Sequence, residues 1–227
     1  MTPRKMNFLF NALIALTMFV LCHTPSFAEP PNLSVLKKEL QTYHDSGLYN
    51  AEIREVIASA HDYMLNAITE NQASAHPKKL AVVLDIDETS LSNYQNIIAR
   101  EFTANKQIIH ENILKANAPA IEDTLQLFNE LKKHHVAVFF ITGREASEKE
   151  ATVKNLHQAG FNNWDGLMLR PSNYHKNSIT PYKSSSRTQI AKQGYTIVAN
   201  IGDQYSDLIG GHAKKGFKLP NPYYYLP

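Results

Sequence analysis

The stretch AVVLDIDETSLSNY, residues 81–94, starts with four apolar residues and then places three carboxylates within four positions. An apolar run of this kind is typical of a strand that is buried on both faces. The acidic residues Asp85, Asp87 and Glu88 follow that run almost directly. An isolated pair of aspartates after a strand can simply form a turn or cap a helix. The surrounding sequence is therefore needed to decide whether these acidic residues have a structural or a chemical role.

The segments around this stretch predict an alternation of strands and helices. Helix-like segments cover residues 120–135, 143–161 and 184–195, and the first of them follows Pro119. Apolar strands without a polar face, separated by helices, indicate a parallel sheet that is covered on both sides. We therefore expect an α/β fold, a Rossmann-like parallel sheet flanked by helices. The expected strands are LAVVLDI from Leu80, VAVFFIT from Val136, GLMLR from Gly166 and TIVANIGD from Thr196.

Residues 1–28 have the pattern of an export signal. Arg4 and Lys5 form a short basic segment, and residues 8–22 are mostly apolar. Ser26 and Ala28 occupy the positions that a signal peptidase reads. A membrane anchor is the alternative, but the apolar run is shorter than the roughly 20 residues that a bilayer requires. We expect cleavage after Ala28 and a periplasmic or secreted protein, with vacuolar delivery as the equivalent fate in a plant.

Cleavage of this leader changes the charge and the cysteine content. The composition, 43% hydrophobic and 19% charged, is that of a globular protein. The only cysteine of the 227 residues, Cys22, lies in the leader, so the mature protein would have no disulfide. Loss of two basic residues leaves 21 Lys and Arg against 21 Asp and Glu, a net charge of about zero. Charge therefore indicates neither a nucleic acid nor an anionic membrane as a partner.

The mature chain has two expected parts. Residues 29–78 predict an N-terminal helical extension, with two helices separated at Gly47. Residues 79–227 predict the α/β core, and residues 90–118 within it predict a small, partly helical cap inserted after the first strand. The second helix has one apolar face at helical spacing, which we expect to pack on the core. That face consists of Ile53, Val56, Ile57, Ala60, Met64, Ala67 and Ile68.

Polar residues gather where the expected strands end. In an open parallel sheet, ligands bind beyond the carboxyl ends of the strands, so these residues are expected to share one pocket. Three aspartates in one pocket repel one another unless a cation lies among them, and ligation by oxygen alone suits Mg²⁺. Carboxylates with a hydroxyl and a lysine are also what phosphoryl transfer requires. The residues are Asp85, Asp87, Thr142, Gly143, Arg144, Arg170, Gly202, Asp203 and Asp207.

The spacing of Asp85 and Asp87 favours a division of roles. On an extended backbone, residues i and i+2 point to the same face. One carboxylate can therefore attack phosphorus while the other protonates the departing oxygen. A neighbouring cation lowers the pKa of a carboxyl group, so the side chain of the proton donor should not bind a metal directly. The backbone carbonyl of Asp87 would satisfy both demands.

Four motifs in this order resemble those of the haloacid dehalogenase (HAD) superfamily of phosphatases. The similarity is closer to its acid phosphatase branch, subfamily IIIB, which includes bacterial class C acid phosphatases and plant vegetative storage proteins. The tail FKLPNPYYYLP also resembles the plant-type ending, so the similarity extends from about Lys79 onward. The motifs are DIDET at 85–89, FFITGR at 139–144, YKSSSR at 182–187 and NIGDQYSDL at 200–208.

The resemblance implies a role for each matching residue. Asp85 would be the nucleophile, and Asp87 would act first as general acid and then as general base. Thr142 and Gly143 would hold the phosphate, and Lys183 would offset the charge of nucleophile and phosphate. The implied Mg²⁺ ligands are the side chains of Asp85 and Asp203 and the carbonyl of Asp87.

Several polar residues near the motifs have more than one interpretation. Asp207 is implied as a partner that reaches the metal through a water or another ligand. Lys176 lies near Lys183 in sequence and is the alternative cation. Arg144 suits either the phosphate or a structural ion pair, whereas Glu88 suits a structural contact.

Aromatic residues supply a further candidate for binding the substrate. Tyr94 lies where the cap begins, and residues 223–225 are three consecutive tyrosines. Together they could form an aromatic wall for a ring of the substrate. Packing of the tail is the alternative role for the same side chains.

The residues and the resemblance together predict an exported, Mg²⁺-dependent acid phosphatase that hydrolyses phosphate monoesters through an aspartyl-phosphate. Its partners would be small phosphorylated substrates, with nucleotides among the candidates, and neither a nucleic acid polymer nor a membrane. The resemblance is also compatible with a homodimer.

Two alternatives remain open. The first is a catalytically weak storage or interaction protein on a HAD scaffold, against which the complete set Asp85, Asp87, Thr142 and Asp203 favours an enzyme. The second is a signalling receiver domain, which the leader disfavours. Asp87 disfavours it as well, since an acid and base at this position promotes rapid hydrolysis of the phosphoryl group.

Overall fold

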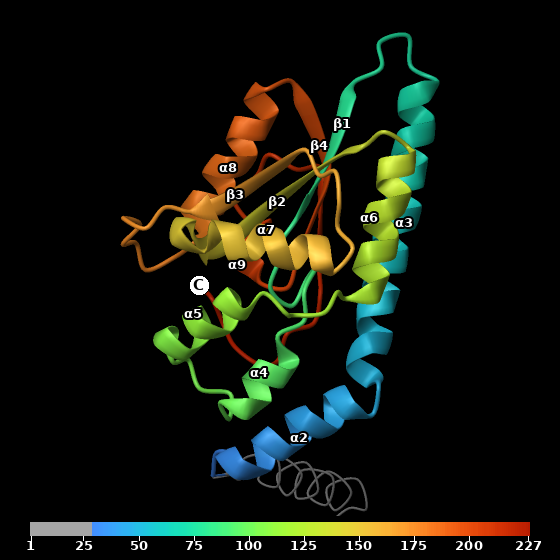
Figure 1. The fold of residues 1–227 in the computed structure, drawn as a ribbon. Helices are drawn as coiled ribbons and strands as arrows, with labels where there is room; N and C mark the ends of the chain where they lie inside the picture. The colour runs from blue at the N-terminus through green and yellow to red at the C-terminus, as the bar shows by residue number, and fades with distance from the viewer. Residues whose placement is uncertain (1–28) are drawn as a thin grey trace, which may run out of the picture. The chain divides into compact units, whose positions relative to one another are not determined.

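The computed structural model describes residues 29–227 (Figure 1). The expected signal peptide, residues 1–28, lies outside the described residues. The chain divides after Leu36 into a short N-terminal unit and a main unit, Lys37–Pro227, and helix α2 (Leu33–Asp45) crosses that boundary. No helix in the described part is long and apolar enough to cross a membrane. All contacts discussed below belong to the main unit.

The centre of the main unit is a five-stranded sheet in which all pairings are parallel, and this confirms the expected α/β class. The strand order is β3-β2-β1-β4-β5, so the chain moves outward from β1 in one direction and later returns to continue on its other side. The switch point therefore lies between β1 and β4, which is where open α/β sheets bind ligands. The strands are β1 (Lys79–Leu84), β2 (Ala137–Glu145), β3 (Gly166–Arg170), β4 (Tyr195–Gly202) and β5 (Lys215–Lys218).

The edge strand β5 was not expected from the sequence. It has four residues, KGFK, of which only Phe217 is buried. A segment with one buried apolar residue has neither the alternation nor the apolar run by which strands are recognised. Pairing with β4 creates this strand, and that pairing is visible only in the tertiary structure.

The helices follow the expected alternation. Gly47 separates α2 from α3 and has a φ of 85°, a conformation that glycine adopts without strain. The region expected to form a cap contains two short helices, α4 and α5. Helix α8 begins before its expected start, because Pro181 is accepted in the first turn of a helix. The helices are α3 (Leu48–Gln72), α4 (Tyr94–Ala99), α5 (Lys106–Lys115), α6 (Glu122–Lys133), α7 (Lys149–Gln158), α8 (Thr180–Lys192) and α9 (Tyr205–Leu208), with a 3₁₀ turn at Ala146–Glu148.

The strand alternation divides the core between the two faces of the sheet. On one face, Val82 and Leu84 pack in a cluster with buried residues of α3, α6 and α7. On the other face, Ala81 and Val83 pack in a second cluster with Ile190 of α8. The expected apolar face of α3 lies in the first cluster, with Ile53, Ile57, Ala60, Met64 and Ile68 buried. Figure 1 shows α3 and α6 side by side, as their contacts require.

The pairing between β2 and β3 has a register shift at the end of β2. Thr142 pairs with Leu169, whereas the next pair on β3 joins Glu145 to Arg170. Gly143 and Arg144 are therefore extra residues on the β2 side, as in a β-bulge. Such irregularities re-aim side chains at the edges of sheets and beside active sites.

Phe140 tests the larger core cluster. Its side chain is fully buried in β2, and its ring lies 6.1 Å from Phe128, 5.7 Å from Phe161 and 5.8 Å from Trp164 between centroids. We expect Phe140→Ala to lower the free energy of unfolding by about 3–5 kcal/mol, because the cavity cannot close fully. Urea denaturation measures the loss. The control Leu114→Ala, at a residue that is 50% exposed, should change stability by less than about 0.5 kcal/mol. Equal effects of the two substitutions would contradict this assignment of the core.

Candidate active site

Asp85 lies directly after β1 and is almost completely buried. Its backbone N–H donates to the carbonyl of Ile201 at 3.0 Å, which joins it to β4 across the switch point. Its carboxylate oxygen Oδ1 accepts a hydrogen bond from Lys183 Nζ at 2.6 Å. Burial raises the pKa of Asp85 well above its ordinary value, and the charges of Asp207 and Asp203 add to the rise while Lys183 opposes it. The oxygen Oδ2 accepts no hydrogen bond from the residues that the structure describes.

Lys183 is the cation of the site. It lies in the first turn of α8, and its side chain is buried between the carboxylates of Asp85 and Asp207. Burial disfavours the charged ammonium, but these two carboxylates raise the pKa of Lys183 above its ordinary value. Lys183 is therefore charged. The alternative cation, Lys176, lies in an exposed loop before α8.

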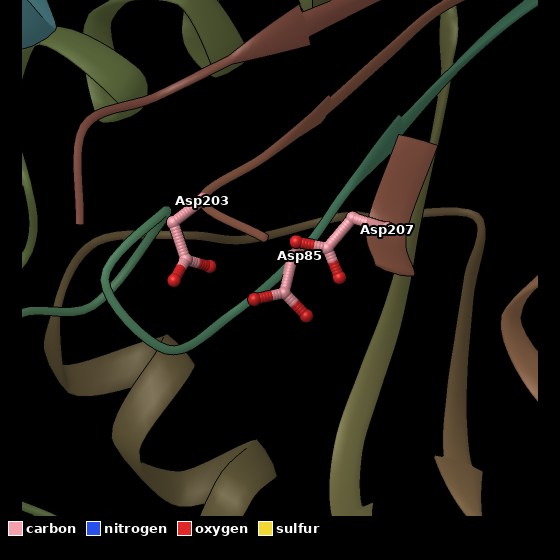
Figure 2. A group of neighbouring side chains, drawn as sticks. All are labelled: Asp85, Asp203 and Asp207. Carbon is pink, nitrogen blue, oxygen red and sulfur yellow. The ribbon is translucent and has the colours of Figure 1, made fainter. Parts of the chain in front are cut away.

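Two further aspartates follow β4. Asp203 comes directly after that strand, and Asp207 lies in α9; both are buried. A Cβ atom on Gly202 would lie 2.4 Å from Asp207 Cβ, so glycine is required for this close approach. Figure 2 shows the three carboxylates of Asp85, Asp203 and Asp207 near the ends of β1 and β4. One oxygen from each lies within 4.8 Å of the others.

This cluster suits a hard divalent cation. Its ligand atoms are all carboxylate oxygens, the type that Mg²⁺ prefers. Burial raises the pKa of Asp203 as well, with a further rise from the charge of Asp207, and a cation would relieve this repulsion. Both oxygens of Asp207 already accept hydrogen bonds, one from Lys183 and one from the backbone N–H of Gln204 at 2.8 Å. Asp85, whose Oδ2 accepts no hydrogen bond from the described residues, and Asp203, whose Oδ1 accepts only the 3.2 Å hydrogen bond of Thr89 among them, are therefore better suited as direct ligands than Asp207.

Asp87 forms an ion pair with Arg144. The guanidinium donates from Nη2 to Asp87 Oδ1 at 2.7 Å and from Nε to both oxygens at 3.1 Å, and Asn93 Nδ2 donates at 2.8 Å. Burial favours the neutral carboxyl group, but Arg144 and Asn93 hold the pKa of Asp87 below its ordinary value. Asp87 keeps 26% of its side chain exposed, whereas Arg144 is buried and also reaches Thr152 Oγ1 at 3.3 Å. The sequence left two roles open for Arg144, phosphate binding or a structural ion pair. In the described structure Arg144 forms an ion pair, and its partner is Asp87.

The end of β2 is braced from β3. Thr142 is buried, and its hydroxyl accepts the N–H of Arg144 at 3.1 Å. Arg170 donates from Nε to the carbonyl of Gly143 at 3.0 Å and from Nη2 to Glu145 Oε1 at 2.5 Å. These hydrogen bonds hold the β2 bulge beside the end of β1, the edge of the sheet at which a phosphate-binding hydroxyl is expected.

Glu88 has a structural role. It is a buried non-glycine residue with a φ of 55°, a conformation that is sparsely populated and concentrated at functional sites. Its carboxyl group accepts the N–H of Asn93 at 2.5 Å and the hydroxyl of Tyr224 at 2.9 Å. Burial, followed by the charge of Asp87, raises the pKa of Glu88 to about 8. These contacts hold the turn that follows Asp87.

Tyr94 lies apart from the carboxylate cluster. Its ring stacks on His44 and is 3% exposed, and its hydroxyl donates to Asp45 Oδ1 at 3.0 Å. As a ligand of the substrate, Tyr94 stays a prediction. In the tail, Tyr223 and Tyr224 are mostly buried and Tyr225 is 74% exposed, so the first two pack as the alternative interpretation proposed.

Sequence reasoning missed residues that stabilise the carboxylate cluster of Asp85, Asp203 and Asp207 through hydrogen bonds to Asp203 and to the segment around Asp207. Arg187 is buried and donates to the carbonyls of Asp207 at 2.5 Å, Gly211 at 2.8 Å and Ile209. It lies four residues after Lys183 on α8, so both side chains project from the same side of the helix. This spacing and its place in the motif YKSSSR were the available signals. Gln204 in the fourth motif and Asn221 in the tail both contact Asp203, but the sequence analysis assigned no role to either.

Comparison with known proteins identifies one family. The HAD superfamily, subfamily IIIB (Acid phosphatase), matches residues 27–227. Among similar proteins, "Stem 28 kDa glycoprotein" of Glycine max is 38% identical over 157 residues, 66% of this chain and 61% of the relative. "Acid phosphatase 1" of Solanum lycopersicum is 38% identical over 148 residues, 63% and 58% of the two chains. The chain thus spans about three fifths of the length of these relatives.

The match with a further relative covers a larger share of both chains. "Vegetative storage protein 1" of Arabidopsis thaliana is 32% identical over 190 residues, 78% of this chain and 70% of the relative. Among solved structures, the class C acid phosphatase from Bacillus anthracis has a TM-score of 0.68 at 21% identity, over 83% of this chain and 86% of that chain. At this identity the likeness supports the fold alone.

Arg187 should stabilise helix α9, which carries Asp207, and the loop that follows it. We expect Arg187→Met to lower the free energy of unfolding by about 3 kcal/mol or more, because three hydrogen bonds from a buried guanidinium are lost at once. Urea denaturation provides the measurement. The matched control is Arg54→Met, since Arg54 is 68% exposed and pairs with Asp123 at 3.2 Å on the surface. Arg54→Met should lower the free energy of unfolding by less than about 1 kcal/mol. Similar losses for both arginines would refute the assigned role.

Proposed function

The chain belongs to subfamily IIIB of the HAD superfamily, the acid phosphatases, and from this premise we propose that it is an exported, Mg²⁺-dependent phosphomonoesterase. The proposed substrates are small phosphate monoesters, with nucleotides among them, and the proposed intermediate is a phosphoryl group on Asp85. The leader pattern of residues 1–28 supports the proposed periplasmic or secreted location.

The main support for this proposal is the arrangement of charged side chains around Asp85. Asp85 is buried at the end of the central strand in direct contact with a buried lysine, and two further carboxylates lie beside it. Burying such charges is costly unless they are paired or bind a metal. A nucleophile, a cation and a candidate metal site at a switch point are the parts that phosphoryl transfer needs.

In the proposed first step, Asp85 Oδ2 attacks phosphorus and forms a phosphorus–oxygen bond while the bond from phosphorus to the ester oxygen breaks. Asp87 gives its proton to the departing oxygen, so the alcohol leaves neutral. Lys183 offsets negative charge on Asp85 and on the phosphoryl oxygens. Thr142 and the backbone of Gly143 orient those oxygens at the end of β2.

In the proposed second step, Asp87 removes a proton from a water that attacks the phosphorus of the aspartyl-phosphate. The bond to Asp85 breaks, inorganic phosphate leaves, and Asp85 returns to its carboxylate form. The ion pair with Arg144 lowers the pKa of Asp87 and so favours its ionised form, which suits this role as base. The acid role in the first step requires a protonated Asp87, and an acidic medium favours that form.

Mg²⁺ would be held by the side chains of Asp85 and Asp203 and by the backbone carbonyl of Asp87. When bound, it would neutralise charge between the nucleophile and the phosphate. A direct bond through the carbonyl leaves the Asp87 side chain free for proton transfer. Asp207 would act through Lys183, whose ammonium it holds against Asp85.

A second candidate function is a storage or interaction role without efficient catalysis. The relative named a vegetative storage protein supports it, since that protein covers 78% of this chain. The complete set of Asp85, Asp87, Thr142 and Asp203 favours the enzyme. The family resemblance is also compatible with a homodimer.

Asp85→Asn tests the nucleophile. We expect loss of detectable p-nitrophenyl phosphate hydrolysis, because the neutral amide cannot form the acyl phosphate. Asp165→Asn is the matched control, since Asp165 binds Lys132 and the N–H of Val138 near the start of β2, away from the site. The control should retain turnover, and circular dichroism should show a folded protein in both cases. Full activity of Asp85→Asn would refute the assignment.

Metal dependence is tested with the purified protein. We expect hydrolysis of p-nitrophenyl phosphate with Mg²⁺ between pH 4 and 8 and its loss in excess EDTA, because the repelling carboxylates need a cation. Restoration by added Mg²⁺ serves as the control for irreversible damage. Equal rates in EDTA would contradict the metal proposal. A folded protein with no turnover in Mg²⁺ would favour the storage or interaction role.

A further inference from the structure

The tail, residues 219–227, reaches back to the candidate metal ligand Asp203. Asn221 Nδ2 donates to Asp203 Oδ2 at 2.6 Å, and Gln204 Nε2 donates to the same oxygen at 2.8 Å. The other oxygen, Oδ1, accepts only the weaker hydrogen bond of Thr89 Oγ1 at 3.2 Å among the described residues. The two oxygens of Asp203 are therefore not equivalent.

The orientation of each amide is set by the backbone of the tail. Asn221 Oδ1 accepts the N–H of Tyr223 at 2.9 Å, so its Nδ2 must face the other way, toward Asp203. Gln204 Oε1 accepts the N–H of Leu226 at 3.1 Å, which leaves its Nε2 for Asp203 and for the carbonyl of Tyr224 at 3.3 Å. Neither amide can rotate without breaking a hydrogen bond to the tail.

The tail itself is anchored at separate points. Tyr224 donates its hydroxyl to Glu88 at 2.9 Å, and Ser206 Oγ donates to the carbonyl of Leu226 at 2.9 Å. The N–H of Ile179 donates to an oxygen of Pro227 at 2.9 Å. These contacts join the tail to the turn after β1, to α9 and to the start of α8. These contacts thus fix the tail, which supplies Asn221 to Asp203 and whose Leu226 N–H holds the Gln204 amide.

We propose that Asn221 and Gln204 are positioning residues, which use the tail to rotate the Asp203 carboxylate so that Oδ1 is presented to Mg²⁺. Donors that occupy Oδ2 stabilise the carboxylate and fix its plane, as hydrogen-bonded partners of metal ligands generally do. Neutral amides do this without adding charge that would compete with the cation. This inference rests on the proposed function, because it assumes Asp203 as a metal ligand.

The proposal also accounts for the chemistry of these two side chains. An arginine or lysine at position 221 or 204 would pair with Asp203 and reduce its attraction for a cation. An apolar side chain would leave Oδ2 without its donors in a buried place, where an unsatisfied carboxylate is costly. An amide supplies one donor for Asp203 and one acceptor for the tail, which is what this geometry uses.

The test is a titration of the purified protein with Mg²⁺ by isothermal calorimetry. We expect Asn221→Ala and Gln204→Ala each to raise the Kd for Mg²⁺ about tenfold or more. The matched control is Asn162→Ala, because Asn162 is exposed before β3 and, within residues 29–227, its amide contacts only the carbonyl of Gly160 and His157. This control should bind Mg²⁺ as the unmodified protein does.

Thermal unfolding separates positioning from a purely structural role. Mg²⁺ that binds the folded protein should raise its Tm by an increment that grows with the logarithm of [Mg²⁺]/Kd, and we expect this increment to shrink in both variants. A lower Tm in EDTA with an unchanged Kd for Mg²⁺ would overturn the inference. Should Asn221→Ala fail to fold, Gln204→Ala decides by the same criterion. Failure of the unmodified protein to bind Mg²⁺ would instead refute the proposed metal site.

Discussion

The contact between Lys183 and two buried carboxylates is the interaction on which the rest of the site depends. A buried ammonium is stable only if opposite charges surround it. Asp85, directly after β1, and Asp207, in α9, supply those charges from segments far apart in sequence. Removing Lys183 would leave two buried carboxylates without their counter-ion. The sheet order, the start of α8 and the loop after β4 must therefore all be correct at once for this triad to exist.

The surrounding structure is arranged to hold these charges in place. Arg187 and Lys183 project from the same helix, so α8 both supplies the cation and binds the carbonyls of the loop that carries Asp207. Glu88 adopts a left-handed conformation just after Asp87, and Asn93 and Tyr224 stabilise it. Backbone strain of this kind persists only where neighbouring contacts over-determine it. The rigidity of the site is distributed over β1, α8, α9 and the tail.

Most of the fold could be predicted because its signals are local. The apolar runs of β1 to β4 and the helical spacing of α3 appear within short windows, and the alternation of strands with helices restricts the sheet to a parallel one. β5 could not be predicted, because KGFK forms a strand only through its pairing with β4. The start of α8 was expected too late, since the segment before Ser184 was not assigned to the helix although Pro181 permits a helix start.

By itself, the sequence determined the chemical types of the site: the motif order, the spacing of Asp85 and Asp87, and a lysine directly before the expected helix that precedes the last expected strand. Only the tertiary structure decided which groups touch. It paired Arg144 with Asp87, turned Tyr94 toward Asp45, and brought Asn221 from the tail onto Asp203. The physical reason is that hydrogen bonds and ion pairs between distant segments depend on register, bulges and rotamers, and these are set by the packing of the whole chain rather than by any local pattern.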